Sequence, residues 1–406
     1  MPREVMAPPH TACRLAVIGV GPLAGWRHCQ AIKGLRGHGA ELACICRRRA
    51  DNMERLGEHG VPLYTDAYQM MCEEPLEGVV IATPTHTHLP IARACIAGAQ
   101  ARQAALGGPQ QGLRAILVET PLCEDLHTAL ELVEIAEDAG VAVLVGRQRR
   151  HSPFATRARE LVANGKFGRF QGFTTEFALL KPDAYFKTDD PRLAWRGHEE
   201  RGGPLLTNLV HDIDLMRYIT GQEVVSVFAA TSRVGRGGKV EGTGVVTAAM
   251  DHGAIGTLFF SDVVPSPWSY EFTTLEDKGY LAVPGDGPND CYHFMGAQRS
   301  LGFPSLRSSR YGAEVTTPGC GAHLVLEREG VVCADPIEVQ MAHFLRICGG
   351  DERPRCSGRD ALQSLAVIAA ALRSAETRTP QHPGDLVKQA AADLLWGAVP
   401  GWGEGE

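Results

Sequence analysis

Two patterns of apolar residues alternate in the first 150 residues: short apolar runs and longer amphipathic stretches. Short runs of β-branched and aliphatic residues predict strands at Arg14–Gly19, Glu41–Cys46, Gly78–Ala82, Ala115–Glu119 and Val141–Gly146. Amphipathic stretches between them predict helices at Leu23–Leu35, Ala50–His59, His88–Ala97 and Leu126–Ala139. Strands that alternate with helices in this way are typical of βαβ units, so the pattern predicts an α/β fold with a doubly wound parallel sheet.

The pattern changes after Arg150. A helix is predicted at Pro153–Asn164, and period-two alternation then predicts strands at Phe170–Phe177, Val224–Ala230, Gly244–Met250 and Ala254–Ser261. Such alternation is typical of antiparallel strands with one buried face, so this part reads as an α+β domain. Further helices are predicted at Ile337–Ile347, Ala361–Ala375 and Asp385–Leu395.

These elements divide the chain into consecutive parts. We expect a disordered lead-in over residues 1–13 and a Rossmann-type domain over 14–148. Within that domain, Gln100–Gly112 is rich in Gly, Gln and Ala and is expected to be an inserted surface loop. An α+β domain for substrate binding and oligomerisation follows over 149–378, and a C-terminal helix and tail occupy 379–406.

Composition narrows the class of protein. Of the 406 residues 44% are apolar and 21% charged, values of a soluble globular chain that exclude general disorder. No apolar run approaches the ~20 residues of a membrane-spanning helix. The N-terminus lacks the apolar core of a secretory signal, so we expect a cytoplasmic protein.

The spacing of the cysteines indicates whether a metal site is expected, and the charge indicates which partners are. The 12 cysteines are scattered without C-x-x-C spacing, so we expect no metal site and no disulfide framework. The formal net charge is -7, and the basic run at Arg47–Arg49 is too short for a nucleic-acid-binding stripe. The expected partner is a small-molecule substrate, without nucleic acid or membrane.

A glycine turn follows the first predicted strand. Gly19 permits a tight turn and Gly21 lets the backbone approach a pyrophosphate, while Pro22 and Leu23 begin a helix whose free N–H groups point at the anion. Ala24 occupies the third glycine position of the motif, and Gly25 comes one residue late. The turn predicts a dinucleotide site, with an ordinary βα turn as the alternative.

Arginine replaces the acid that usually binds the adenosine ribose. That acid is expected at the end of the second strand, where this chain has Arg47 followed by Arg48. Guanidinium groups suit a 2′-phosphate, so we predict NADP(H) in preference to NAD(H). The alternative is a solvated basic loop.

Several segments together resemble the glucose-fructose oxidoreductase / inositol dehydrogenase / MocA (Gfo/Idh/MocA) family of nicotinamide-dependent oxidoreductases. The matching segments are the glycine turn with His28 in the next helix, Ala82–His88, Val118–Leu122, Gly202–Asp214 and Ser357–Ala361. The likeness covers residues 14–378 in the family's order.

The resemblance implies a Rossmann domain and a second domain with an open, mostly antiparallel sheet often used for homo-oligomerisation. The active site would lie in the cleft between them. Thr83, Pro84 and His88 would line the cofactor cleft, and Glu119 would lie near the nicotinamide ribose. His211 would be the histidine that faces the substrate hydroxyl or carbonyl.

Two departures from the family pattern bear on chemistry. Thr120 stands where the family usually has a lysine, and Thr207 where it often has a carboxylate. A threonine hydroxyl donates hydrogen bonds but is neither a cation nor an ordinary base near neutral pH, which leaves His211 as the acid/base group. Lys181 and Tyr185 are candidates to compensate, with a surface loop lysine as the alternative.

Further side chains suit a carboxylate or a polyhydroxylated ring. We expect substrate contacts from Arg149, Trp195, Arg196, Thr207 and Asn208. Alternatively, Arg149 and Arg150 tie the region between the domains to nearby carboxylates, and Asp214 has a structural role.

Three functions remain open. The first is an NADP(H)-dependent oxidoreductase that acts on a C–OH/C=O pair of a sugar, cyclitol or related small polar molecule. The second is a reductase or isomerase of specialised metabolism with a less polar imine, enone or ketone substrate. The third is a non-catalytic cofactor-binding regulator, which Thr120 in place of the lysine would explain.

Overall fold

The computed structural model divides the chain into two compact units. It describes residues 12–21, 24–48, 57, 59–107, 112–186, 194–198, 202–235, 239–276, 280–281, 289–315, 319 and 321–397. Unit 1 takes its described residues from Met1–Gln148, Pro336–Leu362 and Asp393–Glu406. Unit 2 takes them from Arg149–Asp335 and Gln363–Ala392.

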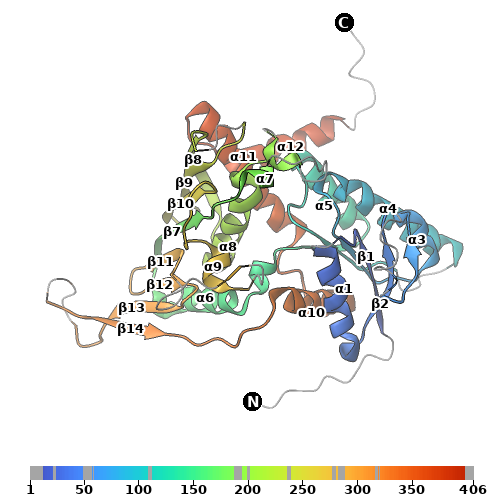
Figure 1. Cartoon of the computed structure of the whole chain (residues 1–406), viewed down its shortest axis with the longest axis horizontal. Helices are drawn as coiled ribbons and strands as arrows, with labels where there is room; N and C mark the ends of the chain where they lie inside the picture. Colours follow the sequence, from blue (N-terminus) through green and yellow to red (C-terminus); the bar gives the residue numbers. More distant parts are fainter. Residues whose placement is uncertain are drawn as a thin grey trace, which may run out of the picture. The chain divides into compact units, whose positions relative to one another are not determined.

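Unit 1 is built on a six-stranded parallel sheet in the order β3-β2-β1-β4-β5-β6. Figure 1 labels its strands β1 and β2. The strands are β1 (Cys13–Ile18), β2 (Ala40–Cys46), β3 (Leu63–Tyr64), β4 (Gly78–Ile81), β5 (Ala115–Val118) and β6 (Ala142–Val145). The strands read as nearly continuous apolar runs because both faces of a parallel sheet are covered. The predicted doubly wound sheet is confirmed.

Helices connect these strands. They are α1 (Ala24–Gly34), α3 (Ala67–Glu73), α4 (His88–Ala105) and α5 (Leu126–Asp138). Side-chain caps fix two of the starts, since Asp66 accepts from the Gln69 N–H and Asp125 from the Thr128 N–H. The helix predicted at Ala50–His59 lies almost wholly outside the described residues.

The loop expected at Gln100–Gly112 is wrong in its first half. Helix α4 continues to Ala105, and residues 108–111 lie outside the described part of the chain. Alanine, glutamine and arginine are strong helix formers, so the composition of Gln100–Ala105 favoured the longer helix.

A late helix belongs to the first unit. The sequence placed residues 336–362 in the second domain, but α10 (Pro336–Gly349) packs against β1 and α1. Its Phe344 and Cys348 are buried in the same core as Leu15 and Ile32. The apolar face of α10 completes the core of unit 1, and no local pattern reveals this partner.

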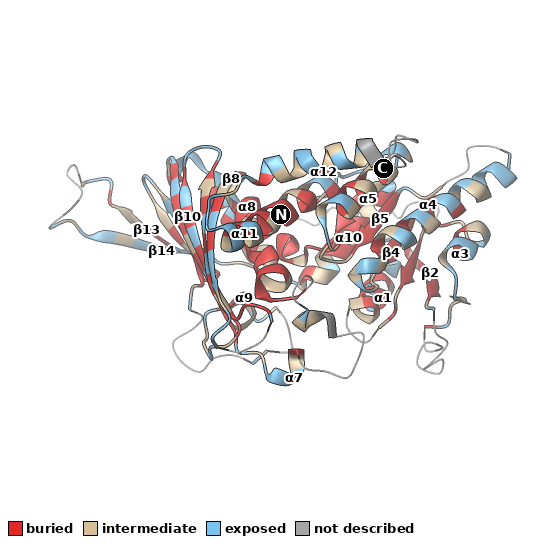
Figure 2. Cartoon of the chain, turned by 90° about the horizontal axis from the view of Figure 1, so that it is seen from above, coloured by how far each residue is buried: buried red, intermediate tan, exposed pale blue. Residues whose placement is uncertain are grey.

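Unit 2 contains an eight-stranded sheet in the order β14-β13-β12-β11-β7-β10-β9-β8. The strands are β7 (Phe170–Ala178), β8 (Val224–Ser232), β9 (Thr243–Met250), β10 (Ile255–Ser261), β11 (Tyr292–Gly296), β12 (Ser300–Phe303), β13 (Arg307–Tyr311) and β14 (Leu324–Arg328). Every pairing is antiparallel except that of β7 with β10. The predicted open, mostly antiparallel sheet is confirmed, and β13 and β14 extend beyond it as a hairpin (Figure 2).

The helices of unit 2 are α6 (Pro153–Ala163), α7 (Asp183–Phe186), α8 (Val210–Thr220), α9 (Tyr270–Thr274), α11 (Gly358–Thr377) and α12 (Pro383–Gly397), the last two shared with unit 1. Among them, α6 and α8 contact the sheet, and Figure 2 shows α8 beside it. Along β10, Leu258 and Phe260 are buried whereas Ile255 and Phe259 are exposed. One face of the sheet therefore carries the core. None of the described helices is long and apolar enough to cross a membrane.

Candidate active site

The glycine turn after β1 is tight at one glycine and open at the next. Gly19 has a φ of +89°, and a Cβ there would lie 2.6 Å from both the Ala82 carbonyl oxygen and Thr83 Cγ2. A Cβ on Gly21 would meet no described atom within 4 Å. A backbone that is compact and yet accessible in this way fits a dinucleotide pyrophosphate.

Close packing behind the turn depends on Gly25. A Cβ on Gly25 would lie 2.3 Å from the Gly19 carbonyl oxygen, so a side chain does not fit there. This is the function of the third glycine in the motif, and the structure assigns it to Gly25 rather than to Ala24, the first residue of α1. Pro22 and Leu23 lie outside the described residues.

Arg47 and Arg48 follow β2 directly. The Gly19 N–H donates to the Cys46 carbonyl at 2.9 Å, which places the end of β2 beside the glycine turn. Arg47 is half-buried, and its backbone N–H donates to the Tyr64 carbonyl at 2.9 Å, whereas Arg48 is exposed. A cation therefore follows the strand where the dinucleotide motif usually has an acid.

Thr83 and Pro84 lie at the same edge of the sheet, because they follow β4, which pairs in parallel with β1. Buried His88 begins α4, and its Nε2 and Nδ1 lie 2.9 and 3.0 Å from the Thr83 and Leu122 carbonyl oxygens. Burial lowers the pKa of His88, although these carbonyls oppose the shift. Both ring nitrogens face protein carbonyls, so the ring of His88 lies between the segments that follow β4 and β5.

Glu119 follows β5 and pairs with a histidine of α1. Its Oε1 lies 2.5 Å from Nε2 of His28, which is fully buried and whose Nδ1 has no partner among the described residues. Burial raises the pKa of Glu119, but the hydrogen bond and charge of His28 and the Thr120 N–H together lower it below its usual value. Glu119 is therefore a fixed carboxylate directly after β5.

Thr120 occupies the position of the family's lysine. Its Oγ1 is buried and has no hydrogen-bond partner in the described part of the chain. No described residue uses the donor or the acceptor capacity of this hydroxyl. His28 was recognised in the sequence only as part of the motif, and its contact with Glu119, 91 residues away, was not predicted.

Arg149 is buried in unit 2, contrary to the expected contact with substrate. Its Nη1 donates to Asp212 Oδ1 at 3.0 Å and to the Tyr292 hydroxyl at 3.2 Å, and its Nη2 donates to Glu271 Oε1 at 2.8 Å. The guanidinium carbon lies 4.1 Å from the centroid of the Tyr270 ring. The alternative, an arginine tied to nearby carboxylates, fits this geometry.

Arg150 is bound in the same manner. Its Nε and Nη2 donate to the two oxygens of Asp214 at 2.8 and 2.9 Å, and Asp214 also accepts from the Ser364 hydroxyl at 3.1 Å. Burial raises the pKa of Asp212, although Arg149 and Tyr292 oppose the shift. Asp212 and Asp214 thus fix α8 from its buried side.

Five of the predicted site residues come together in unit 2: Lys181, Tyr185, Arg196, Thr207 and Asn208. Lys181 Nζ donates to Asn208 Oδ1 at 2.5 Å and lies 4.5 Å from the centroid of the Tyr185 ring. The Arg196 guanidinium carbon lies 4.0 Å from the same centroid. Thr207 Oγ1 is 2.9 Å from Asn208 Oδ1 and 2.8 Å from the Gly203 carbonyl oxygen. We call these five residues the Tyr185 cluster; the side chain of Trp195 lies outside the described residues.

Backbone contacts hold this cluster in place. The Lys181 N–H donates to the Asp262 carbonyl at 2.9 Å, which fixes the chain after β7. Thr207 and Asn208 belong to a π-helical turn, Leu205–Leu209, whose Leu205 N–H donates to buried Glu241 at 2.9 Å. Gly203, with a φ of +87°, is required because a Cβ would lie 2.5 Å from that carboxylate.

His211 is half-buried near the start of α8. Asn208 precedes it by about one helical turn, so the contact between Lys181 and Asn208 lies on a neighbouring part of the helix surface. Asp212, which was not among the predicted site residues, holds the helix through Arg149. His211 therefore lies three residues after Asn208, the residue that accepts from Lys181, on a helix held by buried ion pairs.

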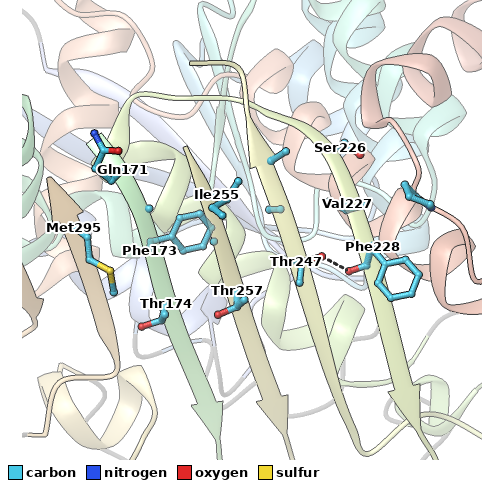
Figure 3. Close-up of a pocket in the computed structure, with 15 residues that line it drawn as sticks. Gln171, Phe173, Thr174, Ser226, Val227, Phe228, Thr247, Ile255, Thr257 and Met295 are labelled. Carbon is cyan, nitrogen blue, oxygen red and sulfur yellow. Dashed lines mark hydrogen bonds between the residues drawn. The ribbon is translucent and has the colours of Figure 1, made fainter. Parts of the chain in front are cut away.

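The exposed face of the unit 2 sheet carries a shallow apolar pocket of about 590 Å³ (Figure 3). Phe228, Ile255 and Met295 line it, together with backbone of Gly172 and Gly256. None of the candidate site residues lines this pocket. No group of His, Cys, Asp or Glu suited to a metal occurs among the described residues.

Two family profiles match the chain. Residues 13–147 match the oxidoreductase family with an NAD-binding Rossmann fold, and residues 155–282 match the GFO/IDH/MocA C-terminal domain. The chain is 27% identical to myo-inositol 2-dehydrogenase of Thermotoga maritima over 374 residues, which cover 90% of this chain and 97% of that protein. It is 29% identical to scyllo-inositol 2-dehydrogenase (NAD(+)) of Bacillus subtilis over 221 residues, 53% of this chain and 56% of that protein.

Solved structures share the fold. The WlbA dehydrogenase of Bordetella pertussis, crystallised with NADH and UDP-GlcNAcA, matches with a TM-score of 0.65 at 23% identity. The match covers 91% of this chain and 98% of that one.

Proposed function

Since this chain belongs to the Gfo/Idh/MocA family of NAD(P)-dependent oxidoreductases, we propose that it transfers a hydride between NADP(H) and a C–OH/C=O pair of a small polar molecule such as a sugar or cyclitol. The observation that carries the proposal is the glycine turn, tight at Gly19, open at Gly21 and packed on Gly25. When bound there, the nicotinamide cofactor supplies or accepts the hydride.

The preference for NADP(H) rests on Arg47. The residue follows β2 beside the turn, and its guanidinium suits a phosphate through charge-assisted hydrogen bonds. Arg48, exposed next to it, adds positive charge at the same edge. An acid at this position would repel a 2′-phosphate and favour a free ribose hydroxyl.

Residues of unit 2 supply the proton chemistry in this proposal. His211 takes the hydroxyl proton during oxidation and returns it during reduction, because imidazole titrates near neutral pH. Lys181, oriented by Asn208 at 2.5 Å, stabilises negative charge on the reacting oxygen. Burial raises the pKa of Tyr185, although Arg196 opposes the shift, so its hydroxyl stays protonated and can donate.

The cofactor edge of unit 1 orients the nicotinamide end in the same proposal. Glu119, held as a carboxylate by His28, accepts hydrogen bonds from the ribose. Thr83 and Pro84 line the site. The hydroxyl of Thr120, which has no hydrogen-bond partner among the described residues, replaces the ammonium of the family's lysine with a neutral donor.

The exposed face of the unit 2 sheet supports a homo-oligomer. Apolar side chains gather there, among them Phe228, Ile255 and Phe259, which are 40, 68 and 41% exposed. The pocket of Figure 3 gives this face a shape into which side chains of a second copy would fit. Large exposed apolar patches are typical of contact surfaces between proteins.

Titration with NADPH and, separately, with NADH tests the cofactor assignment, with binding followed by the fluorescence of reduced nicotinamide. We expect tighter binding of NADPH, and we expect Arg47→Asp to weaken NADPH binding about tenfold or more while sparing NADH. The matched control is Arg36→Asp, which makes the same change of charge at an exposed position before β2.

Absorbance at 340 nm then reports turnover in a screen of sugars and cyclitols. Equal binding of the two cofactors would contradict the NADP(H) preference and leave the oxidoreductase intact. Binding without turnover across the screen would favour the non-catalytic alternative, and binding of neither cofactor would contradict the proposed function.

A further inference from the structure

Arg196 differs from three buried arginines of unit 2 in having no carboxylate partner among the described residues. Arg149, Arg150 and Arg217 each donate to a carboxylate of Asp212, Asp214 or Glu223 at 2.7–3.0 Å. Arg196 instead lies against the Tyr185 ring, and its buried Nε has no hydrogen-bond partner in the described part of the chain. Its charge is therefore not balanced by a described acid in contact with it.

A second cation shares the same ring. Lys181 Nζ lies 4.5 Å and the Arg196 guanidinium carbon 4.0 Å from the Tyr185 centroid. A phenol ring attracts cations through its quadrupole, but this attraction does not remove the repulsion between two like charges. An anion close to both cations would offset this repulsion.

The side-chain amide of Asn208 adds further donors to the cluster. Asn208 uses its Oδ1 to accept from Lys181, and its Nδ2 hydrogens have no acceptor among the described residues. A set of ammonium, guanidinium and amide donors matches a group that only accepts hydrogen bonds. Carboxylates and phosphates are such groups.

We propose that the substrate carries an oxyanion, a carboxylate or a phosphate, and that Arg196 binds it together with Lys181 and Asn208. The inference rests on the proposed function, because it assigns this anion to the molecule on which His211 acts. Asn208 lies about one helical turn before His211, so one small polyhydroxylated acid spans both groups. Neutral sugars and cyclitols of the same size are then poorer substrates.

Isothermal titration calorimetry on the full chain tests this, with and without NADPH at low ionic strength. The probes are D-glucose, D-glucuronate and D-glucose 6-phosphate, which share a ring and differ in charge. We expect one or both charged probes to bind about tenfold or more tightly than glucose. Arg196→Gln should abolish the difference, and Arg196→Lys should keep part of it.

The matched control is Arg169→Gln, which removes an exposed arginine of the same unit whose recorded contact is a 3.5 Å hydrogen bond to a backbone carbonyl. It should leave the preference for charged probes unchanged, and circular dichroism should show that every variant is folded. Which charged probe binds more tightly identifies the oxyanion as carboxylate or phosphate.

Three outcomes would overturn the proposal: equal binding of glucose and the charged probes, a preference that survives Arg196→Gln, or no binding of any probe. The proposed function fails on a different measurement, the nicotinamide titration. A charge preference without nicotinamide binding would thus reject the oxidoreductase and keep the anion site, and nicotinamide turnover with neutral sugars alone would do the reverse.

Discussion

Arg149 and Arg196 are the same residue type in one structural unit, yet their surroundings are opposite. Arg149 is 5% exposed and donates to two carboxylates and a tyrosine hydroxyl. Arg196 is half-buried, lies against Tyr185, and has no carboxylate partner among the described residues. Both were predicted to contact substrate. Arg149 is instead bound by acids of the fold, and for Arg196 the contact stays a prediction.

The difference lies in how each charge is compensated. A buried ion stays in a fold only if protein groups replace the water it has lost. Asp212 and Glu271 do this for Arg149, which makes the arginine part of the folded structure. The half-buried Arg196 keeps hydrogen-bonding capacity that a ligand can use. Whether an arginine stabilises the fold or is available to a ligand therefore depends on the acids around it more than on its place in the sequence.

Arg149→Met should have the largest effect on stability, because it leaves Asp212 and Glu271 buried without their cation. We expect a loss of about 3–5 kcal/mol in the free energy of unfolding, measured by urea denaturation with circular dichroism. Arg196→Met is the matched variant and should cost less than about 1 kcal/mol. Similar losses for the two variants would remove the contrast between the arginines.

Tyr292→Phe should have an intermediate effect that depends on pH. The Tyr292 hydroxyl donates to Asp212, and its loss should cost about 1–2 kcal/mol. Burial already raises the pKa of Asp212, and Tyr292 opposes that shift, so the variant raises this pKa further. A raised folded-state pKa of an acid stabilises the fold at low pH, and this stability is lost as pH rises through that pKa.

The cost of Tyr292→Phe should therefore be larger at about pH 8 than at about pH 5 in urea denaturation. Tyr311→Phe, a half-buried tyrosine of β13, serves as the control and should cost little at either pH. A pH-independent cost for Tyr292→Phe would mean that the Arg149 network does not depend on the charge of Asp212.

Burial explains which strands the sequence predicted. The strands of unit 1 are covered on both faces and read as apolar runs, and those from β7 to β10 alternate because one face is buried. Strand β13, Arg-Ser-Ser-Arg-Tyr, has no apolar pattern. It is held by pairing with β14, including the contact of Arg310 with Glu327, 17 residues away. Such pairings are not encoded in a local pattern.

The candidate site follows the same rule. Motifs identified Gly19, Glu119 and His211 because each lies in a recognisable run of residues. Partners remained hidden where they come from distant segments, as Asp212 does for Arg149 across 63 residues. Lys181 and Tyr185 were predicted as separate candidates. In the structure Lys181 donates to Asn208 and lies against the Tyr185 ring. The chemical groups of the candidate site could be predicted from residue types. Which acid balances which cation could be seen only in the folded structure.

Tyr185→Leu should have the smallest effect on stability, because Lys181 and Arg196 can return to water when the ring is lost. The expected cost is about 0.5–1 kcal/mol, the contribution of a cation–π contact near the surface. Tyr185→Phe keeps the ring and should stay within about 0.5 kcal/mol of the parent in the same urea denaturation. A loss for Tyr185→Leu as large as that for Arg149→Met would contradict this. The fold would then depend on the contact of Arg196 with the Tyr185 ring as strongly as it depends on the contacts of Arg149 with its acids.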